Sequence, residues 1–334
     1  MNIKSINYNP GWHEQLLDYM QSVYPHRDRL YLNWWLSNID NSGKDCWVKC
    51  VLIIDDKELI GCTTVNKVFV DCEGTIENIY SRGNTIISPS QRGKGISKLI
   101  YSEVNSYNNW FSFGITDIAW KIQPKYVNNF TPIRPINVYV VINSGILRQL
   151  LKKMFRSRTR QCLFPDSLPM NKYESLTKIS DAAQLEYPQN GKWTSDSMEF
   201  VRDEDFIRKR FFDIYCSERY AIYQYISNDR SIGYVVLRTT RYKVLDMMSL
   251  VDYRFYSSKD ELKAFKVASK IASINKIGLV IAQSSRNYGF KLSPCIIRMK
   301  KKLNCAIGMK DRVSQFNDML ITSADSDLDF VYYK

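Results

Sequence analysis

The sequence predicts a mixed α/β fold in which helices flank a central, largely antiparallel sheet, with two copies of that fold in tandem. Three observations support this prediction. Hydrophobic residues make up 45% of the 334 residues and charged residues 24%, as in a globular chain long enough for two domains. The order helix, hairpin, strand, helix, strand occurs twice. One junction between a strand and a helix carries a basic loop with two glycines.

The first half of the chain begins with two helical patterns. Apolar residues recur at helical intervals over residues 12–24, and a second short helix is expected over 29–36. The strand-like run 47–54 ends at Asp55-Asp56-Lys57, so we expect a hairpin with the run 59–70. The later elements are expected to be strands 76–80, 85–88, 111–116 and 138–142, and helices over 94–107 and after Asp117.

The second half repeats this order more faintly. A helix over residues 203–215 precedes a hairpin made of 220–227 and 232–240, and a strand, helix and strand follow at 244–252, 257–275 and 278–283. Between the halves, a basic run and scattered prolines indicate a connector. The expected limits are therefore 1–145 for the first domain, 146–195 for the connector and 196–334 for the second domain.

The charge favours anionic partners: nucleotides, phosphorylated cofactors, nucleic acid or an anionic membrane surface. The formal net charge is +13. Part of the excess lies in residues 148–160, which form either a solvated connector or a patch facing phosphate or lipid.

The cysteines, histidines and N-terminus argue against other classes of site and compartment. Eight cysteines without a C-x-x-C pair and two histidines argue against a metal site and against a Ser/His or Cys/His triad. We expect buried free thiols and no metal. No apolar run approaches the roughly 20 residues that span a bilayer, and residues 1–7 lack a signal-peptide core, so a cytoplasmic protein is expected.

The basic loop lies within residues 85–100, where a β-branched run ends at Pro89 and a helical pattern follows the loop. A helix N-terminus presents free backbone N–H groups, which favour a phosphate or pyrophosphate. A P-loop is excluded because Gly93-Lys94-Gly95 lacks the upstream glycine and the Lys-Ser/Thr ending. A dinucleotide fingerprint is disfavoured because its third glycine is missing and the preceding strands form hairpins.

Arg92-Gly93-Lys94-Gly95-Ile96-Ser97 resembles the R/Q-x-x-G-x-G/A loop of the GCN5-related N-acetyltransferase (GNAT) superfamily, with Ser97 where Gly or Ala is usual. Leu59-Ile60-Gly61 and Phe113-Gly114-Ile115-Thr116-Asp117 are similar to that family's early glycine strand and fifth strand. The resemblance covers roughly residues 45–142. It implies the acyl-CoA N-acyltransferase fold, with acetyl-CoA or another acyl-CoA as co-substrate. The second half resembles the same fold without the pyrophosphate loop, as in two-domain bacterial proteins of this type.

The resemblance also implies site residues. The backbone N–H groups of Ile87 and Ser88 would stabilise the oxyanion, and Asp117 stands where the family often has Asn. Glu77 is the candidate base, unless it is a surface glutamate on an edge strand, and Tyr126 is the candidate acid, unless it is a core aromatic residue. The implied cofactor-binding residues are Ile87, Ser88, Arg92, Gly93, Lys94, Gly95, Ile96, Ser97 and Asp117.

The leading functional hypothesis is an acyl-CoA-dependent N-acetyltransferase that acylates a primary amine of a small acceptor by direct attack on the thioester. An amino sugar, a sugar nucleotide or a cell-envelope precursor is a candidate acceptor, and Trp34 and Trp35 could stack on a sugar. One alternative is an aminoacyl-tRNA-dependent transferase of the peptidoglycan-bridge type, which the net charge suits but the retained loop does not; other nucleic acids are not expected as partners. Another is a non-catalytic acyl-CoA-binding protein.

Overall fold

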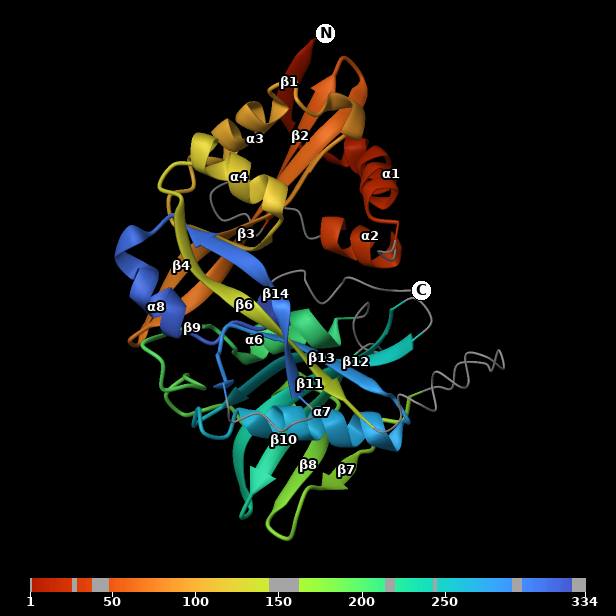
Figure 1. Cartoon of the computed structure of the whole chain (residues 1–334), viewed down its shortest axis with the longest axis vertical. Coiled ribbons are helices and arrows are strands. Elements are labelled where there is room, and N and C mark those ends of the chain that lie inside the picture. Colours follow the sequence, from red (N-terminus) through yellow and green to blue (C-terminus); the bar gives the residue numbers. More distant parts are fainter. Residues whose placement is uncertain are drawn as a thin grey trace, which may run out of the picture. The chain divides into compact units, whose positions relative to one another are not determined.

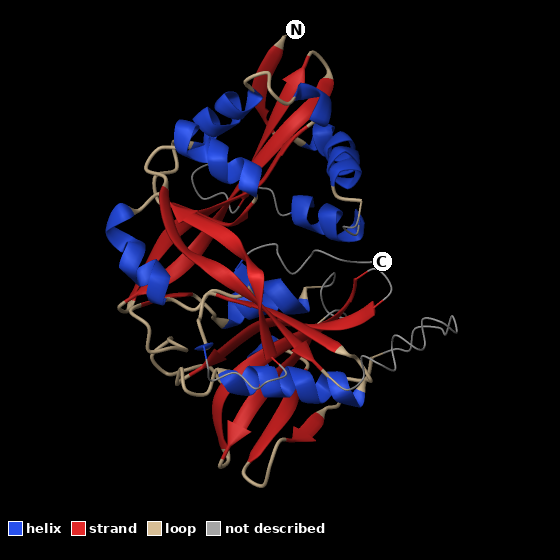
Figure 2. Cartoon of the chain, in the orientation of Figure 1, coloured by secondary structure: helices blue, strands red, loops and turns tan. Residues whose placement is uncertain are grey.

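The structure is a computed structural model that describes residues 2–25, 29–37, 48–143, 162–213, 220–242, 245–289 and 296–325. The chain divides into two compact units. Unit 1 contains Met1–Val70, Ile76–Pro135 and Leu303–Asn317, and unit 2 contains Asp71–Thr75, Ile136–Lys302 and Asp318–Lys334. Both are mixed α/β structures with helices beside strands (Figures 1 and 2).

Unit 1 is built on a sheet in the order β1-β2-β3-β4-β5-β14. The β1–β2, β2–β3 and β5–β14 pairs are antiparallel, and β4–β5 is parallel. The strands are β1 (Ile3–Asn7), β2 (Val48–Asp55), β3 (Glu58–Cys72), β4 (Thr75–Ile87), β5 (Trp110–Ile115) and the end of β14 (Ile296–Ile307). The helices are α1 (His13–Val23), α2 (Arg29–Ser37), α3 (Ile96–Val104), α4 (Asp117–Tyr126) and α8 (Val313–Asp318).

The position of α3 follows from its apolar stripe. Ile96 and Ile100 are buried against Val51, Ile53 and Ile60, which belong to β2 and β3. Burying such side chains stabilises the packing by roughly 1.5–3 kcal/mol each. This contact fixes the N-terminal end of α3, and therefore the basic loop that precedes it.

Unit 2 has the sheet order β6-β13-β12-β11-β10-β8-β7. The β10–β11 and β11–β12 pairs are antiparallel, β12–β13 is parallel, and β13–β6 is antiparallel. The strands are β6 (Thr131–Ile142), β7 (Ser167–Pro169), β8 (Glu174–Ile179), β9 (Met198–Phe200), β10 (Ala221–Ser227), β11 (Arg230–Tyr242), β12 (Leu245–Phe255) and β13 (Leu279–Ser284). The helical segments are α6 (Glu204–Ile207), the π-turn η4 (Arg208–Phe212) and α7 (Leu262–Ile274).

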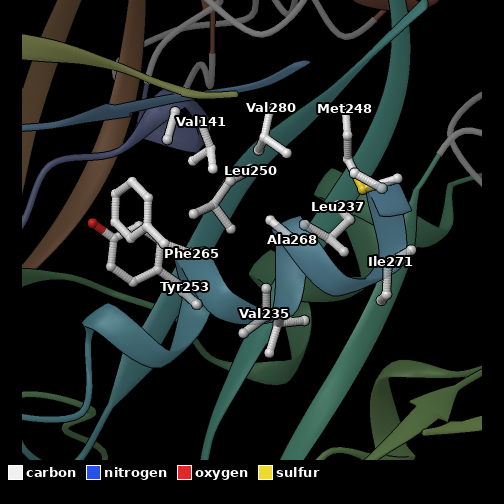
Figure 3. Close-up of a cluster of buried hydrophobic side chains, with 14 of the residues drawn as sticks. Val141, Val235, Leu237, Met248, Leu250, Tyr253, Phe265, Ala268, Ile271 and Val280 are labelled. Atoms are coloured by element: carbon white, nitrogen blue, oxygen red, sulfur yellow. The ribbon is translucent and has the colours of Figure 1, made fainter. Parts of the chain in front are cut away.

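The core of unit 2 lies between α7 and the strands beside it. Phe265, Ala268 and Ile271 of α7 pack against Val235 of β11 and Leu250 of β12, all of them buried (Figure 3). The chain order hairpin, strand, helix, parallel strand is the order of β2 to β5 in unit 1.

The two units divide the chain differently from the limits expected from the sequence. Residues 136–142 belong to unit 2, where β6 pairs with β13 from Asn137↔Ser284 to Ile142↔Leu279. Residues 304–307 belong to unit 1, where β14 pairs with β5. The described residues 162–195 of the expected connector also belong to unit 2, and there β8 pairs with β10. A hydrophobic pattern reveals a strand but not its partner, so distant pairings were missed. The basic run 148–160 lies outside the described residues.

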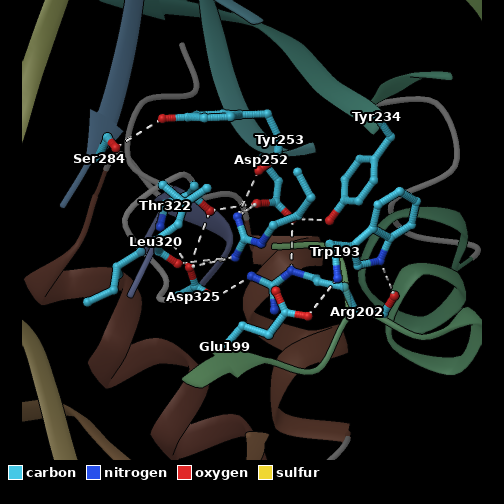
Figure 4. Close-up of polar contacts among 12 residues, drawn as sticks. Trp193, Glu199, Arg202, Tyr234, Asp252, Tyr253, Ser284, Leu320, Thr322 and Asp325 are labelled. Carbon is cyan, nitrogen blue, oxygen red and sulfur yellow. Dashed lines mark hydrogen bonds and ion pairs between the residues drawn. The ribbon is translucent and has the colours of Figure 1, made fainter. Parts of the chain in front are cut away.

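Unit 2 contains a network of buried charged side chains (Figure 4). The Asp252 carboxylate on β12 accepts from Arg202 Nε at 2.9 Å and from Arg254 Nη1 at 2.8 Å. It also accepts from the hydroxyls of Tyr234 and Thr322. Asp325 pairs with Arg202 as a second carboxylate. Burial alone would raise the pKa of Asp252, but the two guanidinium groups outweigh it and hold the pKa at about 2.

We expect Asp252→Asn to lower the free energy of unfolding by about 3–5 kcal/mol at pH 7, because two buried guanidinium groups lose their shared carboxylate. Urea unfolding monitored by circular dichroism measures this. Since the folded pKa lies below the ordinary value of 3.8, the stabilisation is present above about pH 4 and is lost toward pH 2. The difference between wild type and variant should therefore narrow by roughly 2 kcal/mol over that range.

The matched control is Asp56→Asn, in the exposed turn between β2 and β3, which should change the unfolding free energy by less than about 0.5 kcal/mol. A difference between Asp252→Asn and wild type that is equal at pH 7 and pH 2 would contradict the charged state assigned to Asp252.

Candidate functional site

The basic loop joins β4 to α3 and is held open by two glycines. Pro89–Gln91 forms a 3-10 turn, after which Gly93 and Gly95 adopt φ values of 84° and 81°. Side chains with a Cβ rarely adopt this left-handed region, so both positions favour glycine. A Cβ built at either glycine would meet nothing within 4 Å. The outer face of the loop is therefore open to a ligand.

The loop and the first turn of α3 present unused backbone donors. The N–H groups of Gln91 and Arg92 are consumed inside the 3-10 turn, and that of Lys98 donates to the Gly95 carbonyl at 3.0 Å. Among the residues that the structure describes, no protein acceptor receives the N–H groups of residues 93–97, and no side chain caps α3. Consecutive free donors at a helix N-terminus form an anion site. We call residues 93–97 the cradle.

The charge around the cradle has one sign. Residues 78–102 contain four cations and no aspartate or glutamate. Arg92, Lys94 and Lys98 are exposed at the cradle, and Lys94 Nζ donates to Gln91 Oε1 at 2.9 Å. Arg82 serves the fold instead: it is buried 4.3 Å from the Trp110 ring and donates to the Val104 carbonyl at the far end of α3. Burial lowers the pKa of Arg82 to about 9.

The strands beside the cradle separate. The described pairing of β4 with β5 consists of Tyr80↔Trp110 and Ser81↔Phe111 and ends there. Asn84 then adopts a left-handed φ of 48° within β4. A left-handed residue within a strand is typical of a β-bulge, the kind of irregularity that bends a strand. Beyond Ser81, the edge of β4 that faces β5 therefore has no described pairing with β5.

The two backbone donors expected at this edge are directed differently. The Ser88 N–H donates to the Ile60 carbonyl of β3 at 2.9 Å, so it is engaged and does not face β5. Because N–H groups alternate in direction along a strand, that of Ile87 is directed toward β5. The structure therefore favours Ile87 over Ser88 as a donor at the diverging edge.

Tyr19 of α1 also contacts this region, and no sequence pattern predicts that contact. Its hydroxyl donates to the Ile60 carbonyl at 3.1 Å and accepts from Ser88 Oγ at 3.3 Å. Burial raises the pKa of Tyr19 to about 12, so the phenol stays protonated at neutral pH. Helical spacing predicts α1 but cannot predict a contact with a residue 69 positions away.

Asp117 begins α4 directly after β5, but it is not the cap of that helix. Thr116 is the N-cap, and its hydroxyl accepts from the Ala119 N–H at 3.3 Å. Asp117 Oδ1 instead accepts from Asn304 Nδ2 of β14 at 3.4 Å. Asp117 thus lies at the C-terminal end of β5 and is partnered by a strand from the end of the chain.

The structure does not bring Glu77 or Tyr126 to the cradle. Glu77 pairs with Arg312 Nη2 at 2.7 Å, and ten residues of β4 separate it from Ile87, about 30 Å at a rise of roughly 3.3 Å each. Tyr126 is 38% exposed and stacks on Tyr101, while its carbonyl accepts from Asn105 at the C-terminal end of α3. Both therefore lie away from the N-terminus of α3.

The two tryptophans expected to stack on a sugar both belong to α2. Trp34 is half-buried on α2, and the side chain of Trp35 lies outside the described residues.

The corresponding junction in unit 2 lacks a cradle. No glycine occurs between Phe255 of β12 and Leu262 of α7, and Asp260 and Glu261 stand at the helix start. Glu261 is buried, accepts from Tyr288 at 3.0 Å and pairs with Arg286 Nε at 3.2 Å. A carboxylate of the chain thus lies where unit 1 offers open donors, and it would repel a phosphate.

The described residues form neither a metal cluster nor a membrane-spanning helix. No group of three or more His, Cys, Asp or Glu side chains there could hold a metal ion. None of the helices formed by those residues combines the length and apolarity needed to cross a membrane.

Comparison with solved structures shows the fold. A probable N-acyltransferase from Enterococcus faecalis V583, described as a conserved protein of unknown function, superposes with a TM-score of 0.57 at 12% identity, covering 92% of this chain and 73% of that one. A GCN5-related N-acetyltransferase from Anabaena variabilis also has a TM-score of 0.57 at 12% identity, with 92% and 72% covered. N-myristoyltransferase of Saccharomyces cerevisiae with bound myristoyl-CoA has a TM-score of 0.52 at 11% identity, with 92% and 82% covered.

The fold is that of the GCN5-related N-acetyltransferases, as the sequence motif implied. No sequence-family description matches the chain. No curated protein matches it in sequence.

We expect the cradle to bind inorganic pyrophosphate, with isothermal titration calorimetry as the measurement. Gly95→Trp should weaken this binding at least about tenfold, because a side chain at φ 81° is strained and would fill the open face of the loop. Gly74→Trp is the matched control: that glycine also has a positive φ and open space around it, but it lies in the turn before β4. Equal affinity in both variants would refute the site.

Proposed function

We propose that the chain is an acyl-CoA-dependent N-acyltransferase whose unit 1 holds the pyrophosphate of the acyl donor. The observation that carries this proposal is the cradle, with five consecutive N–H groups, residues 93–97, that have no protein acceptor among the described residues. Arg92, Lys94 and Lys98 add positive charge around it. The fold is one in which solved structures named as N-acetyltransferases and N-myristoyltransferase occur.

The residues fit the diphosphate of coenzyme A in chemistry and in space. Backbone donors at the start of α3 suit a diphosphate, and the open face at Gly93 and Gly95 admits it without a clash. When bound, acyl-CoA supplies a thioester carbonyl that an amine can attack. We place the pantetheine arm along the diverging edge of β4, where its amides can pair with the strand.

In the proposed reaction, Ile87 stabilises the transition state. A neutral primary amine attacks the thioester carbon, a C–N bond forms, the C–S bond breaks, and the thiol of coenzyme A leaves with the proton lost by the amine. The Ile87 N–H, aimed toward β5, donates to the oxyanion as charge develops on the carbonyl oxygen. The Ser88 N–H does not bind the oxyanion, because it already donates to the Ile60 carbonyl. Ser88 instead takes part in the site through its hydroxyl, which donates to the Tyr19 hydroxyl.

For the acyl group and for the acceptor we propose a chemical class and not a single compound. Acetyl-CoA is the first donor to test, with longer acyl-CoA thioesters beside it, because one structural neighbour was solved with myristoyl-CoA. The acceptor is a small molecule with a primary amine, with amino sugars and sugar nucleotides first in the panel. Unit 2 is proposed to support the fold or the acceptor, since Glu261 occupies the position of a second cradle.

The proposal predicts that purified protein binds acetyl-CoA or a longer acyl-CoA in calorimetry and releases free thiol on addition of an amine. Gly95→Trp should weaken acyl-CoA binding by at least about 100-fold, whereas Gly74→Trp should bind as wild type does. The absence of acyl-CoA binding would refute the proposal. Binding without turnover on any amine would identify a non-catalytic acyl-CoA protein, and amine acylation dependent on aminoacyl-tRNA would identify the peptidoglycan-bridge type of transferase.

The roles predicted for Glu77 and Tyr126 are tested in the same assay. From their positions we expect Glu77→Gln and Tyr126→Phe to keep kcat within about threefold of wild type, because neither side chain reaches the diverging edge of β4. A general acid or base would contribute about 100-fold or more. A loss of that size in kcat, with unchanged stability and cofactor affinity, would restore the sequence-based assignment.

A further inference from the structure

The excess positive charge of the chain is concentrated near its end. The stretch 262–310 contains eleven lysines and arginines and no aspartate or glutamate. Some of these cations are neutralised by the fold: Lys263 pairs with Glu174 at 2.6 Å, and Arg286 pairs with Asp196 at 2.6 Å. Others have no such role, so their positions indicate where the charge is available.

Four of the remaining cations, Arg298, Lys300, Lys301 and Lys302, lie together on one strand segment, residues 297–302, which we call the basic strand segment. It lies in the part of β14 that belongs to unit 2, and all six of its side chains are exposed. Arg298 Nη1 donates to Asn287 Oδ1 at 2.7 Å. Within the described part of the chain, no carboxylate pairs with Lys300, Lys301 or Lys302.

The basic strand segment also exposes apolar side chains. Ile297 is 45% and Met299 is 44% exposed. Successive side chains in a strand point to opposite faces, so both share a face with Lys301, while Arg298, Lys300 and Lys302 share the other. Long lysine side chains can bend around a strand and keep their charge in a polar layer. The segment therefore combines apolar groups with a dense positive charge.

This combination fits an anionic lipid surface better than a nucleic acid. Lysines near a bilayer are attracted to anionic headgroups, and apolar side chains gain by entering the interface. Single-stranded nucleic acids are held largely by aromatic side chains that stack on bases, and residues 297–302 include no aromatic residue. Apolar side chains would gain little against a phosphate backbone.

We propose that the basic strand segment binds reversibly to the surface of membranes that contain anionic phospholipid. The test is co-sedimentation of the full chain with vesicles of phosphatidylcholine containing phosphatidylserine, and with vesicles of phosphatidylcholine alone. Binding should require phosphatidylserine and weaken as salt rises. The triple variant Lys300→Gln, Lys301→Gln, Lys302→Gln should bind on the order of 100-fold more weakly.

Two further variants serve as comparisons. The first tests whether vesicle binding depends on the net charge of the chain, and the second tests whether it depends on the apolar side chains of the segment. Lys57→Gln, Lys121→Gln, Lys125→Gln removes the same charge from exposed sites in unit 1 and should leave vesicle binding within about threefold of wild type. Ile297→Ser, Met299→Ser keeps every charge and should weaken vesicle binding about tenfold.

Binding of tRNA or duplex DNA that is lost in the Lys300–Lys302 triple variant, without binding to either vesicle, would overturn the proposal in favour of a nucleic acid. An equal loss of vesicle binding in both lysine triple variants would overturn the proposal, because binding would then depend on the net charge of the chain and not on this segment. Vesicle binding unchanged by any variant would overturn it outright. None of these outcomes depends on acyl-CoA, so the acyltransferase proposal stands or falls separately.

Discussion

The separation of β4 from β5 is the constraint on which unit 1 depends. Two parallel pairings, at Tyr80 and Ser81, hold the strands together, and the described pairing ends there, three residues before the left-handed Asn84. If β4 stayed paired to its end, the N–H of Ile87 would be consumed in the sheet. Beyond the end of β4 the chain passes through Pro89 into the cradle at the start of α3. The unpaired edge and the loop of the candidate site thus lie on one continuous stretch of the chain, residues 82–97.

Unit 2 has the same order of strands and helix, but its junction between β12 and α7 is not open. Its strand and helix meet at Asp260 and Glu261, and the region beside β12 is filled by the Asp252 network and by Glu261 with its tyrosine and arginine partners. At this junction the charged side chains are exposed in unit 1, whereas in unit 2 Glu261 is buried and paired within the chain. The difference lies in a few side chains at the junction and not in the order of the strands.

The sequence predicted the elements well because their signals are local. Helical spacing located α1, α3 and α7, the Asp55-Asp56-Lys57 turn located the β2–β3 hairpin, and the two glycines marked the cradle. What could not be predicted depends on contacts between distant residues. Tyr19 reaches Ser88 across 69 positions, and Glu77 pairs with Arg312 across 235. A periodicity carries no information about such partners, so it could predict neither where the two units divide nor which side chain Glu77 contacts.

Because β14 comes late in the sequence, its pairing with β5 affects how unit 1 folds during synthesis. The edge partner of β5 comes from residues 304–307, and the second carboxylate of the Asp252 network is Asp325. During synthesis from the N-terminus, β5 therefore keeps an unpaired edge until residues 304–307 have been made, and Arg202 lacks its second carboxylate until Asp325 has been made. Because an unpaired strand edge is a template for pairing with another chain, the pairing of β14 with β5 removes a site of aggregation.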